Sequence, residues 1–457
     1  MAGANWKALL AAQETLPDLT AAGVQIDDHH QKHTVHHQLL VVAWRAMRDG
    51  YYDANLGNRN WDEIRRKYID AAAAATDDTA FARVVSLMLG ELNGSHLGFS
   101  GRGSRGGPDP DLQWNELTGH LGLRYDPNYK GPGWLVKDVI EGGPASEAEV
   151  GIQAGDVVLA IDGTTVDPSM PVESVLTGFH ARDIAVRVRR GDAEPREVTL
   201  RPTTYAGIRR MLYSRWIEGN QKVVEEQTDG RLGYLHIRGM NWSSFLKFEL
   251  ELFKVGHNKD GLIIDVRANG GGSTADHLLT VLTQPQHAIT VPRGGGRGYP
   301  QDRRVYATWH KPIVVLCDQD SFSNAEIFAH AIKTLGRGRL VGMPTAGGVI
   351  STGRAGVMDL GSIRMPFRGW YVLDGQDMEL NGAMPHFLVP RQPGEWPSGQ
   401  DGQLAKAIAV LQEDVAEYQA RPQPELVPSS ERGASPVREI RNSKTREKHQ
   451  RERRVRF

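Results

Sequence analysis

The chain has 457 residues, enough for about three domains of ordinary size. Its 54 lysines and arginines nearly balance 55 aspartates and glutamates, so the net charge of -1 gives no global attraction to nucleic acid or an anionic membrane. The one cysteine, Cys317, excludes an intramolecular disulfide and a cysteine-based zinc cluster, which fits a reducing compartment. The N-terminal apolar stretch is interrupted by Gln13, Glu14 and Pro17, and no apolar run reaches roughly 18 residues, so we expect a cytoplasmic protein without a membrane span.

The first segment expected to fold is helical. Residues 1–37 form a weakly patterned extension, and apolar residues then recur at helical spacing from 38 to 93, which predicts about three helices. We place a helical domain at 38–100. Residues 101–116 are rich in Gly, Pro and Asp and mark a linker.

A histidine cluster precedes these helices. Spacings of three and four residues could place pairs of histidines on one helical face, as a zinc or nickel site requires. The HExxH motif is absent and only Asp27 or Asp28 could add a carboxylate, so structural histidines are favoured over a metal site, and we expect no metal. The cluster consists of His29, His30, His33, His36 and His37.

Two further domains and a tail follow. Short β-type runs with one helix-like piece at 172–180 predict a small β module over 117–203. From 204 to 420, strands, glycine turns and helices alternate, which predicts an α/β layer whose parallel strands gather ligands at their carboxyl ends. Residues 421–457 are Pro/Ser-rich and then basic, and we expect a disordered tail that is a solubilising end or a partner-binding arm.

The first chemical signal is Ser323, between an apolar strand at 313–317 and a helix at 326–335. A serine on such an elbow is exposed near a helix N-terminus, whose unpaired N–H groups favour developing negative charge. Ser321, Ser323 and Asn324 are also ordinary N-cap residues, so a nucleophile and a helix cap both remain open.

A glycine turn and a Ser-His pair give the other signals. The segment DVRANGGG at 265–272 lets backbone N–H groups approach a ligand, as an oxyanion hole requires, or forms a simple tight turn. No lysine follows at the spacing of a nucleotide-binding loop, which disfavours phosphate binding. In GELNGSHLGF, Ser95 and His96 lie between glycines after a helix, and catalytic and structural roles are both possible.

Together these pieces resemble one family. GHLGLRY at 119–125 resembles the carboxylate-binding loop of a PDZ domain, and VESVLTGFH resembles its groove-lining helix. The region after it resembles the tail-specific, C-terminal-processing serine peptidases, in which a strand ending DVRxNGGG precedes a serine elbow. Most of them use a lysine base in a GxPTxGKG segment, but this chain reads GMPTAGGVIS, with Gly348 at the lysine position. The chain therefore resembles the branch without that lysine, the tricorn-type proteases, over roughly 38–412, but without their β-propeller domains.

The resemblance implies a multidomain α+β fold with a helical N-terminal segment, a PDZ-like β module and a crotonase-like (ClpP/crotonase) α/β peptidase domain. It implies Ser323 as the nucleophile and His96 as the general base that removes its proton. Ser95 and Glu379 would complete a tetrad that orients the imidazole. No cofactor is implied, and the closed assemblies of the family imply a homo-oligomer.

The resemblance implies the oxyanion donors but does not say what binds the substrate terminus. The N–H groups of Asn324 and of a glycine at 270–272, taken as Gly271, would hold the oxyanion. Arg293 and Arg297 lie in a basic loop that we expect to bind acidic or carboxylate groups, with a solvated loop as the alternative. The PDZ module could capture a free C-terminal carboxylate, or it could be a structural or gating domain.

The predicted function is a serine endo/exopeptidase that hydrolyses oligopeptides or unfolded chain ends through an acyl-enzyme. The alternative is a non-catalytic protein of the same fold that holds peptide termini or apolar ligands. A third possibility, an acyl-CoA hydratase-type enzyme, follows from the crotonase-like architecture, and the PDZ module before that domain argues against it.

Overall fold

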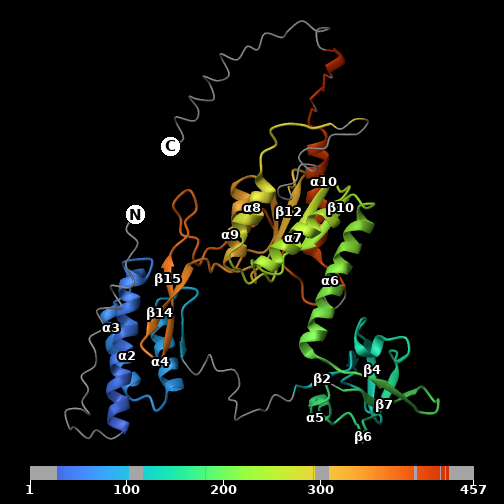
Figure 1. The fold of residues 1–457 in the computed structure, drawn as a ribbon, viewed down its shortest axis with the longest axis horizontal. Coiled ribbons are helices and arrows are strands. Elements are labelled where there is room, and N and C mark those ends of the chain that lie inside the picture. The colour runs from blue at the N-terminus through green and yellow to red at the C-terminus, as the bar shows by residue number, and fades with distance from the viewer. Residues whose placement is uncertain are drawn as a thin grey trace. The chain divides into compact units, whose positions relative to one another are not determined.

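The computed structural model describes residues 28–101, 117–180, 182–291, 293, 308–395, 399–422, 424–427 and 429–431, with side chains from residue 35 onward (Figure 1). The chain forms two units, Met1–Val415 and Ala416–Phe457. Nearly all of the expected linker and the basic end of the tail lie outside the described residues. Within the described part, no helix is both long and apolar enough to cross a membrane.

The N-terminal part combines three helices with a three-stranded sheet. Helices α2 (Asp28–Gly50), α3 (Trp61–Ala73) and α4 (Asp78–Gly90) are the three that the sequence predicts, although the first already begins at Asp28. Strand β1 (Gly98–Gly101) pairs antiparallel with β15 (Gly361–Arg368), and β15 pairs with β14 (Ser351–Val357).

These helices and the sheet share one core. Phe81, Val85 and Met88 of α4 are fully buried in the same cluster as Ile363 and Met365 of β15. Strands β14 and β15 come after the predicted nucleophile in the chain. The pairing of β1 with β15 therefore holds the loop between α4 and β1 next to this late part of the chain. This pairing is not predicted by local sequence pattern, because the partner strands are far apart in the chain.

The β module is an antiparallel sheet of short strands. Its strand order is β3-β4-β5-β7-β8, with one further strand paired to β5, a separate two-stranded pair and one short helix. The sheet strands are β3 (Leu123–Tyr125), β4 (Trp134–Val139), β5 (Asp156–Ile161), β6 (Thr164–Thr165), β7 (Ile184–Arg190) and β8 (Arg196–Leu200). The pair is β2 (Gly119–His120) with β9 (Thr203–Thr204), and the helix is α5 (Val172–Leu176). Buried Val158, Ile161 and Val186 form the centre of its core.

The third part is the predicted α/β layer with parallel strands. Five parallel strands follow the order β10-β11-β12-β13-β16. They are β10 (Leu232–His236), β11 (Gly261–Asp265), β12 (Ile313–Cys317), β13 (Arg339–Gly342) and β16 (Phe387–Leu388). The helices are α6 (Tyr205–Gln227), α7 (Trp242–Lys254), α8 (Ala275–Thr283), α9 (Asn324–Thr334) and α10 (Gly402–Gln419).

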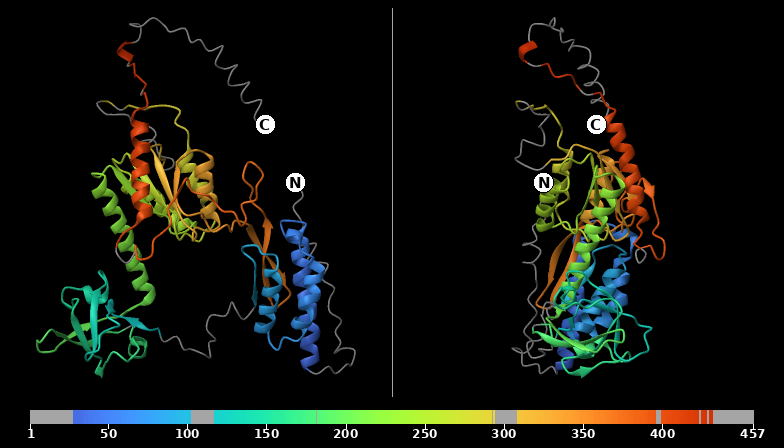
Figure 2. Two further views of the ribbon diagram at one scale, coloured as in Figure 1. Left: turned by 180° about the vertical axis from the view of Figure 1, so that it is seen from behind. Right: turned by 90° about the vertical axis from the view of Figure 1, so that its right-hand side faces the viewer.

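Alternate residues of the central strands face two separate cores. Val315 of β12 packs with α7, α8 and α9, whereas Val314 and Leu316 pack with α6 and α10. The sheet is thus covered by helices on both faces, which Figure 2 shows from two further sides. Continuous apolar strands such as IVVLC are typical of this burial.

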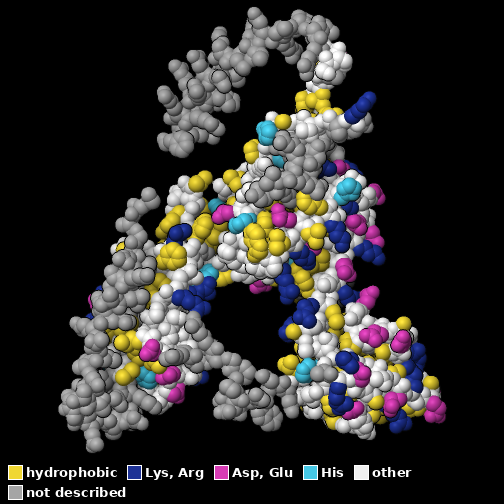
Figure 3. All heavy atoms as spheres, viewed as in Figure 1, with side chains coloured by type: hydrophobic (Ala, Val, Ile, Leu, Met, Phe, Trp, Pro, Cys, Tyr) yellow, Lys and Arg dark blue, Asp and Glu magenta, His cyan; other side chains and the backbone are white. Residues whose placement is uncertain are grey.

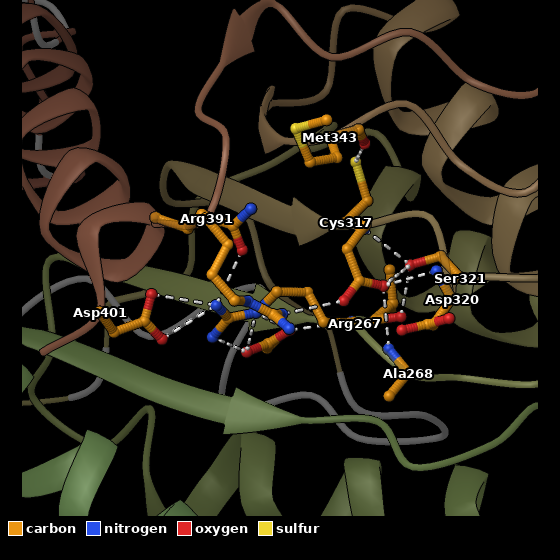
Figure 4. A network of polar contacts seen from close by, with 12 residues as sticks. Arg267, Ala268, Cys317, Asp320, Ser321, Met343, Arg391 and Asp401 are labelled. Atoms are coloured by element: carbon orange, nitrogen blue, oxygen red, sulfur yellow. Dashed lines mark hydrogen bonds and ion pairs between the residues drawn. The ribbon is translucent and has the colours of Figure 1, made fainter. Parts of the chain in front are cut away.

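The carboxyl ends of β11 and β12 are locked together by polar groups. Buried Arg267 bonds Asp265 with its Nε at 3.0 and 3.1 Å and its Nη2 at 2.7 Å, and its Nη1 reaches Asp401 at 2.9 Å (Figure 4). The loop after β12 is bonded to the loop after β11 through the Ser321 hydroxyl, which donates to the Val266 carbonyl at 2.8 Å. This network holds the two loops that follow the strands side by side.

We predict that Arg267→Ala lowers the free energy of unfolding by about 3–5 kcal/mol, because it leaves the fully buried Asp265 carboxylate without its cation. Chemical denaturation followed by circular dichroism measures this loss. The matched control is Arg201→Ala, whose pair with Asp183 is 65% and 57% exposed and should change stability by less than about 1 kcal/mol. Equal effects of the two variants would contradict the prediction.

Candidate active site

Ser323 lies on the elbow between β12 and α9. Its φ of 58° and ψ of -120° fall where non-glycine residues seldom occur. Gly271, with φ of 86°, lies directly against it, because a Cβ atom at position 271 would be 2.6 Å from the Ser323 Cβ. This close approach requires glycine at 271 and brings the glycine turn and the serine together.

Strained backbone recurs in the loops around this elbow. Five of the eleven described non-glycine residues with positive φ lie in these loops: Asn93 (50°), His96 (61°), Ala268 (54°), Ser323 (58°) and Leu380 (64°). Such conformations persist only where the surrounding structure enforces them, and they cluster at functional sites.

Glu326 fixes the elbow from inside the protein. Its side chain is fully buried, and its Oε1 accepts from the N–H groups of Ser323 and Gly348, each at 2.8 Å. Its Oε2 accepts from the Gly347 N–H at 2.5 Å and from the Thr345 hydroxyl at 2.6 Å. The carboxylate therefore ties the elbow at Ser323 to the loop 345–348.

Ser95, His96 and Glu379 meet although they come from opposite ends of the chain. The Ser95 N–H donates to Glu379 Oε1 at 2.5 Å, and the Ser95 hydroxyl donates to Oε2 at 3.1 Å. The same hydroxyl lies 2.7 Å from His96 Nδ1. Glu379 is 7% exposed and also accepts from the Val349 N–H at 3.0 Å. Three of the four residues expected in the tetrad thus form one hydrogen-bonded chain.

His96 reaches the elbow through an aromatic contact. Its ring stacks on Phe322, the residue before Ser323, with centroids 4.6 Å apart and planes at 21°. The described contacts include no hydrogen bond between His96 and Ser323. Burial, with a smaller contribution from the charge of Arg364, lowers the pKa of His96 from 6.5 to about 4. The imidazole is therefore neutral near pH 7 and able to accept a proton.

The two predicted oxyanion donors differ in availability. The Gly271 N–H donates to Asn269 Oδ1 at 2.9 Å. The Asn324 N–H, at the first position of α9, has no acceptor among the described residues. The Asn324 side chain accepts from the Ala275 N–H at 2.8 Å, which links α9 to the start of α8.

The predicted substrate-binding arginines receive little support from their positions. Arg293 is exposed, and no contact with the residues above is among the described ones. Arg297 lies outside the described residues.

The histidine cluster is only partly described. His36 is 3% exposed, stacks on Phe81 with centroids 4.7 Å apart, and places Nδ1 3.2 Å from the Ala75 carbonyl oxygen. His37 is exposed, and the side chains of the other three histidines lie outside the described residues. No group of three side chains suited to a metal occurs in the described part of the chain.

Sequence reasoning missed Phe322, Arg354 and Arg364. The two arginines are direct cross-strand partners on β14 and β15, and Arg364 Nε donates to Thr352 Oγ1 at 3.0 Å. Lys and Arg side chains appear in dark blue beside these strands (Figure 3). The alternation in GSIRMPFR places Arg364 on the polar face of a strand, but nothing local indicates that it lies near His96.

Three family models match the chain in succession. Residues 33–90 match the Tricorn protease C1 domain, 119–204 the Tricorn protease PDZ domain, and 231–389 Peptidase family S41. The last match includes Ser323 and Glu379, whereas the first ends before Ser95.

Individual relatives agree with these matches. Tricorn protease homolog 1 of Streptomyces coelicolor is 29% identical over 85% of this chain, and the Tricorn protease of Thermoplasma volcanium is 26% identical over 83%. The chain spans only 36% of the length of either relative. A Carboxyl-terminal-processing protease of Synechocystis is 26% identical over 84% of this chain and 88% of its own length. The crystal structure of the tricorn protease superposes on 84% of this chain and 37% of its own with a TM-score of 0.69 at 25% identity.

The helical, PDZ and peptidase segments occur in the order that the sequence predicts, and the predicted family and fold class are confirmed. Residues 231–389 thus match peptidase family S41, and the chain is similar over most of its length to tricorn and carboxyl-terminal-processing proteases, which indicates a serine peptidase.

Proposed function

We propose that this chain hydrolyses oligopeptides or unfolded chain ends through an acyl-enzyme, with Ser323 as the nucleophile and His96 as the general base. The observation that carries the proposal is the hydrogen-bonded chain from Glu379 through Ser95 to His96, whose ring lies against the residue before Ser323. A binding protein would have no need for a strained serine beside an oriented histidine, so the non-catalytic alternative is not favoured.

The hydrogen-bond chain assigns a role to each histidine nitrogen. The Ser95 hydroxyl donates to Glu379, so it accepts from the Nδ1–H of His96. Nε2 then carries the lone pair that takes the Ser323 proton as the serine oxygen attacks the scissile carbonyl carbon. The Glu379 charge, relayed through Ser95, stabilises the imidazolium that results.

The acyl-enzyme forms and breaks by the same proton transfers. His96 gives its proton to the leaving amine, which releases the first product and leaves the acyl group on Ser323. A water molecule then attacks this ester while His96 takes its proton, and return of that proton to the serine oxygen releases the second product. The Ser323–His96 hydrogen bond would form when peptide is bound, since catalytic hydrogen bonds are commonly loose in empty sites.

The Asn324 N–H is the proposed principal oxyanion donor, because it lies at the N-terminus of α9 and donates to none of the described residues. Gly271 would contribute when its N–H is shared with or released from Asn269.

We predict that Ser323→Ala abolishes labelling by a fluorophosphonate probe and lowers kcat for peptide hydrolysis by about 10⁴-fold or more. Ser273→Ala is the matched control, because Ser273 is exposed in the facing glycine turn. It should keep both labelling and turnover. Unchanged hydrolysis by Ser323→Ala would exclude the proposed mechanism.

The low pKa of His96 predicts an unusual pH profile. A base with a folded-state pKa of about 4 stays unprotonated, and thus active, down to that pH. The acid limb of kcat/KM should therefore lie near pH 4 rather than near 6.5. If the acid limb lies near pH 6.5 in an enzyme that requires Ser323, burial does not lower the pKa of His96 as predicted.

We predict that Glu379→Gln lowers kcat by about 10²-fold to 10⁴-fold, because the charge that stabilises the imidazolium is lost. The KM should change little, since Glu379 contacts Ser95 and Val349 rather than a site for peptide. Asp374→Asn, an exposed carboxylate in the same loop, serves as control. An equal loss of kcat in both variants would contradict the assigned role.

A further inference from the structure

The ring of Phe322 occupies the space beside position 348. A Cβ atom built on Gly348 would lie 2.1 Å from Phe322 Cε2, 2.8 Å from Cζ and 3.0 Å from Cδ2. Real Cβ atoms essentially never approach other atoms so closely, so any side chain at 348 must displace the ring. The backbone of Gly348 cannot simply retreat, because its N–H is bonded to the buried Glu326 carboxylate at 2.8 Å.

The same ring supports the imidazole of His96. The two rings are stacked with centroids 4.6 Å apart and planes at 21°. The base of the Phe322 side chain is fixed by its backbone, whose N–H donates to the Asn269 carbonyl at 2.9 Å. Phe322 therefore lies between the elbow, Gly348 and the histidine.

One hydrogen bond does not determine the plane of an imidazole. The Ser95 contact holds Nδ1 of His96 but leaves the ring free to turn about that nitrogen. A stacked aromatic ring removes this freedom, because tilting would lose the face-to-face contact. It also excludes water from one side of the imidazole.

We propose that Phe322 is the positioning residue that orients His96 as a base in this site, and that its ring can do so only because position 348 is a glycine. A side chain at 348 and the stacked ring would compete for the same volume, so the stack on His96 requires glycine at 348. This inference rests on the proposed function, because it assigns Phe322 its role through His96.

Other charged or titratable groups around the Ser95–His96 loop come from three separate elements. Arg364 on β15 acts on the imidazole directly. Glu379 acts through Ser95. The Tyr51 hydroxyl, in the turn after α2, lies 2.9 Å from where a Cβ of Gly94 would be. None of these groups changes when Phe322 is replaced, so a shift in the pH profile reports on the ring alone.

The test compares Phe322→Ala, Phe322→Leu and Phe322→Tyr in steady-state peptide hydrolysis across pH. We expect the alanine and leucine variants to lose about 10-fold to 100-fold in kcat with little change in KM, as a misplaced catalytic group does. Their acid limb should move from about 4 toward 6.5, since water reaches the imidazole. The tyrosine variant keeps a stacked ring and should keep the low acid limb.

Gly348→Ala tests the same contact from the other side. Its methyl group should push the ring away from His96 and reproduce the loss of kcat and the shifted acid limb. When Gly348→Ala is added to Phe322→Ala, kcat should fall no further, because no ring remains for the methyl group to displace. Gly356→Ala is the matched control, since a Cβ at this glycine of β14 meets nothing within 4 Å.

The outcomes separate this inference from the proposed function. If Phe322→Ala and Gly348→Ala leave kcat and the acid limb unchanged in an enzyme that still requires Ser323, the inference is wrong and the mechanism stands. If their losses of kcat add fully in the double variant, the ring and position 348 act independently and the inference is also wrong. If wild-type turnover does not require Ser323, the proposed function fails first. Should Phe322→Ala not fold, Phe322→Leu and Gly348→Ala carry the same test.

Discussion

A carboxylate removed from water must have its oxygens satisfied by donors, and the site is organised around Glu326, which meets this requirement with four. Two of its donors, the N–H groups of Gly347 and Gly348, are followed in the chain by the Val349 N–H, which donates to Glu379 instead. Three successive N–H groups thus connect the carboxylate under the serine to the carboxylate behind the histidine. The relative placement of Ser323 and His96 depends on this short segment more than on any direct contact between them.

The site is assembled from segments that only the tertiary fold brings together. His96 lies on a loop held by the pairing of β1 with β15. Ser323 lies on a loop that the Ser321 hydroxyl and the Phe322 N–H bond to the carbonyls of Val266 and Asn269. Both loops contain residues in strained backbone conformations. The cores beneath the sheet and the helices stabilise that strain, which is why the rigid α/β layer and the N-terminal helices are both needed.

Much of the fold was predictable because its signals are local. The apolar strand IVVLC before a polar turn and a helix predicts parallel α/β structure and puts Ser323 on an elbow. The contact of Ser95 with Glu379 was not predictable from pattern, since 284 residues separate them, and only the family resemblance suggested it. The sequence shows a glycine at 348 where the resemblance leads us to expect a lysine. The ring of Phe322, which fills the space beside this glycine, is apparent only in the folded structure.

Cys317 ends the strand that leads to Ser323, and its thiol is completely enclosed. Burial raises the pKa of the Cys317 thiol to about 12, so the reactive thiolate is scarce at neutral pH. Since this sequence contains no second cysteine, we expect this chain to react little with maleimides while it is folded. One cysteine introduced at an exposed position, such as Thr164 in β6, would accept a single fluorophore, and motions of the PDZ domain could be followed without removing any native residue.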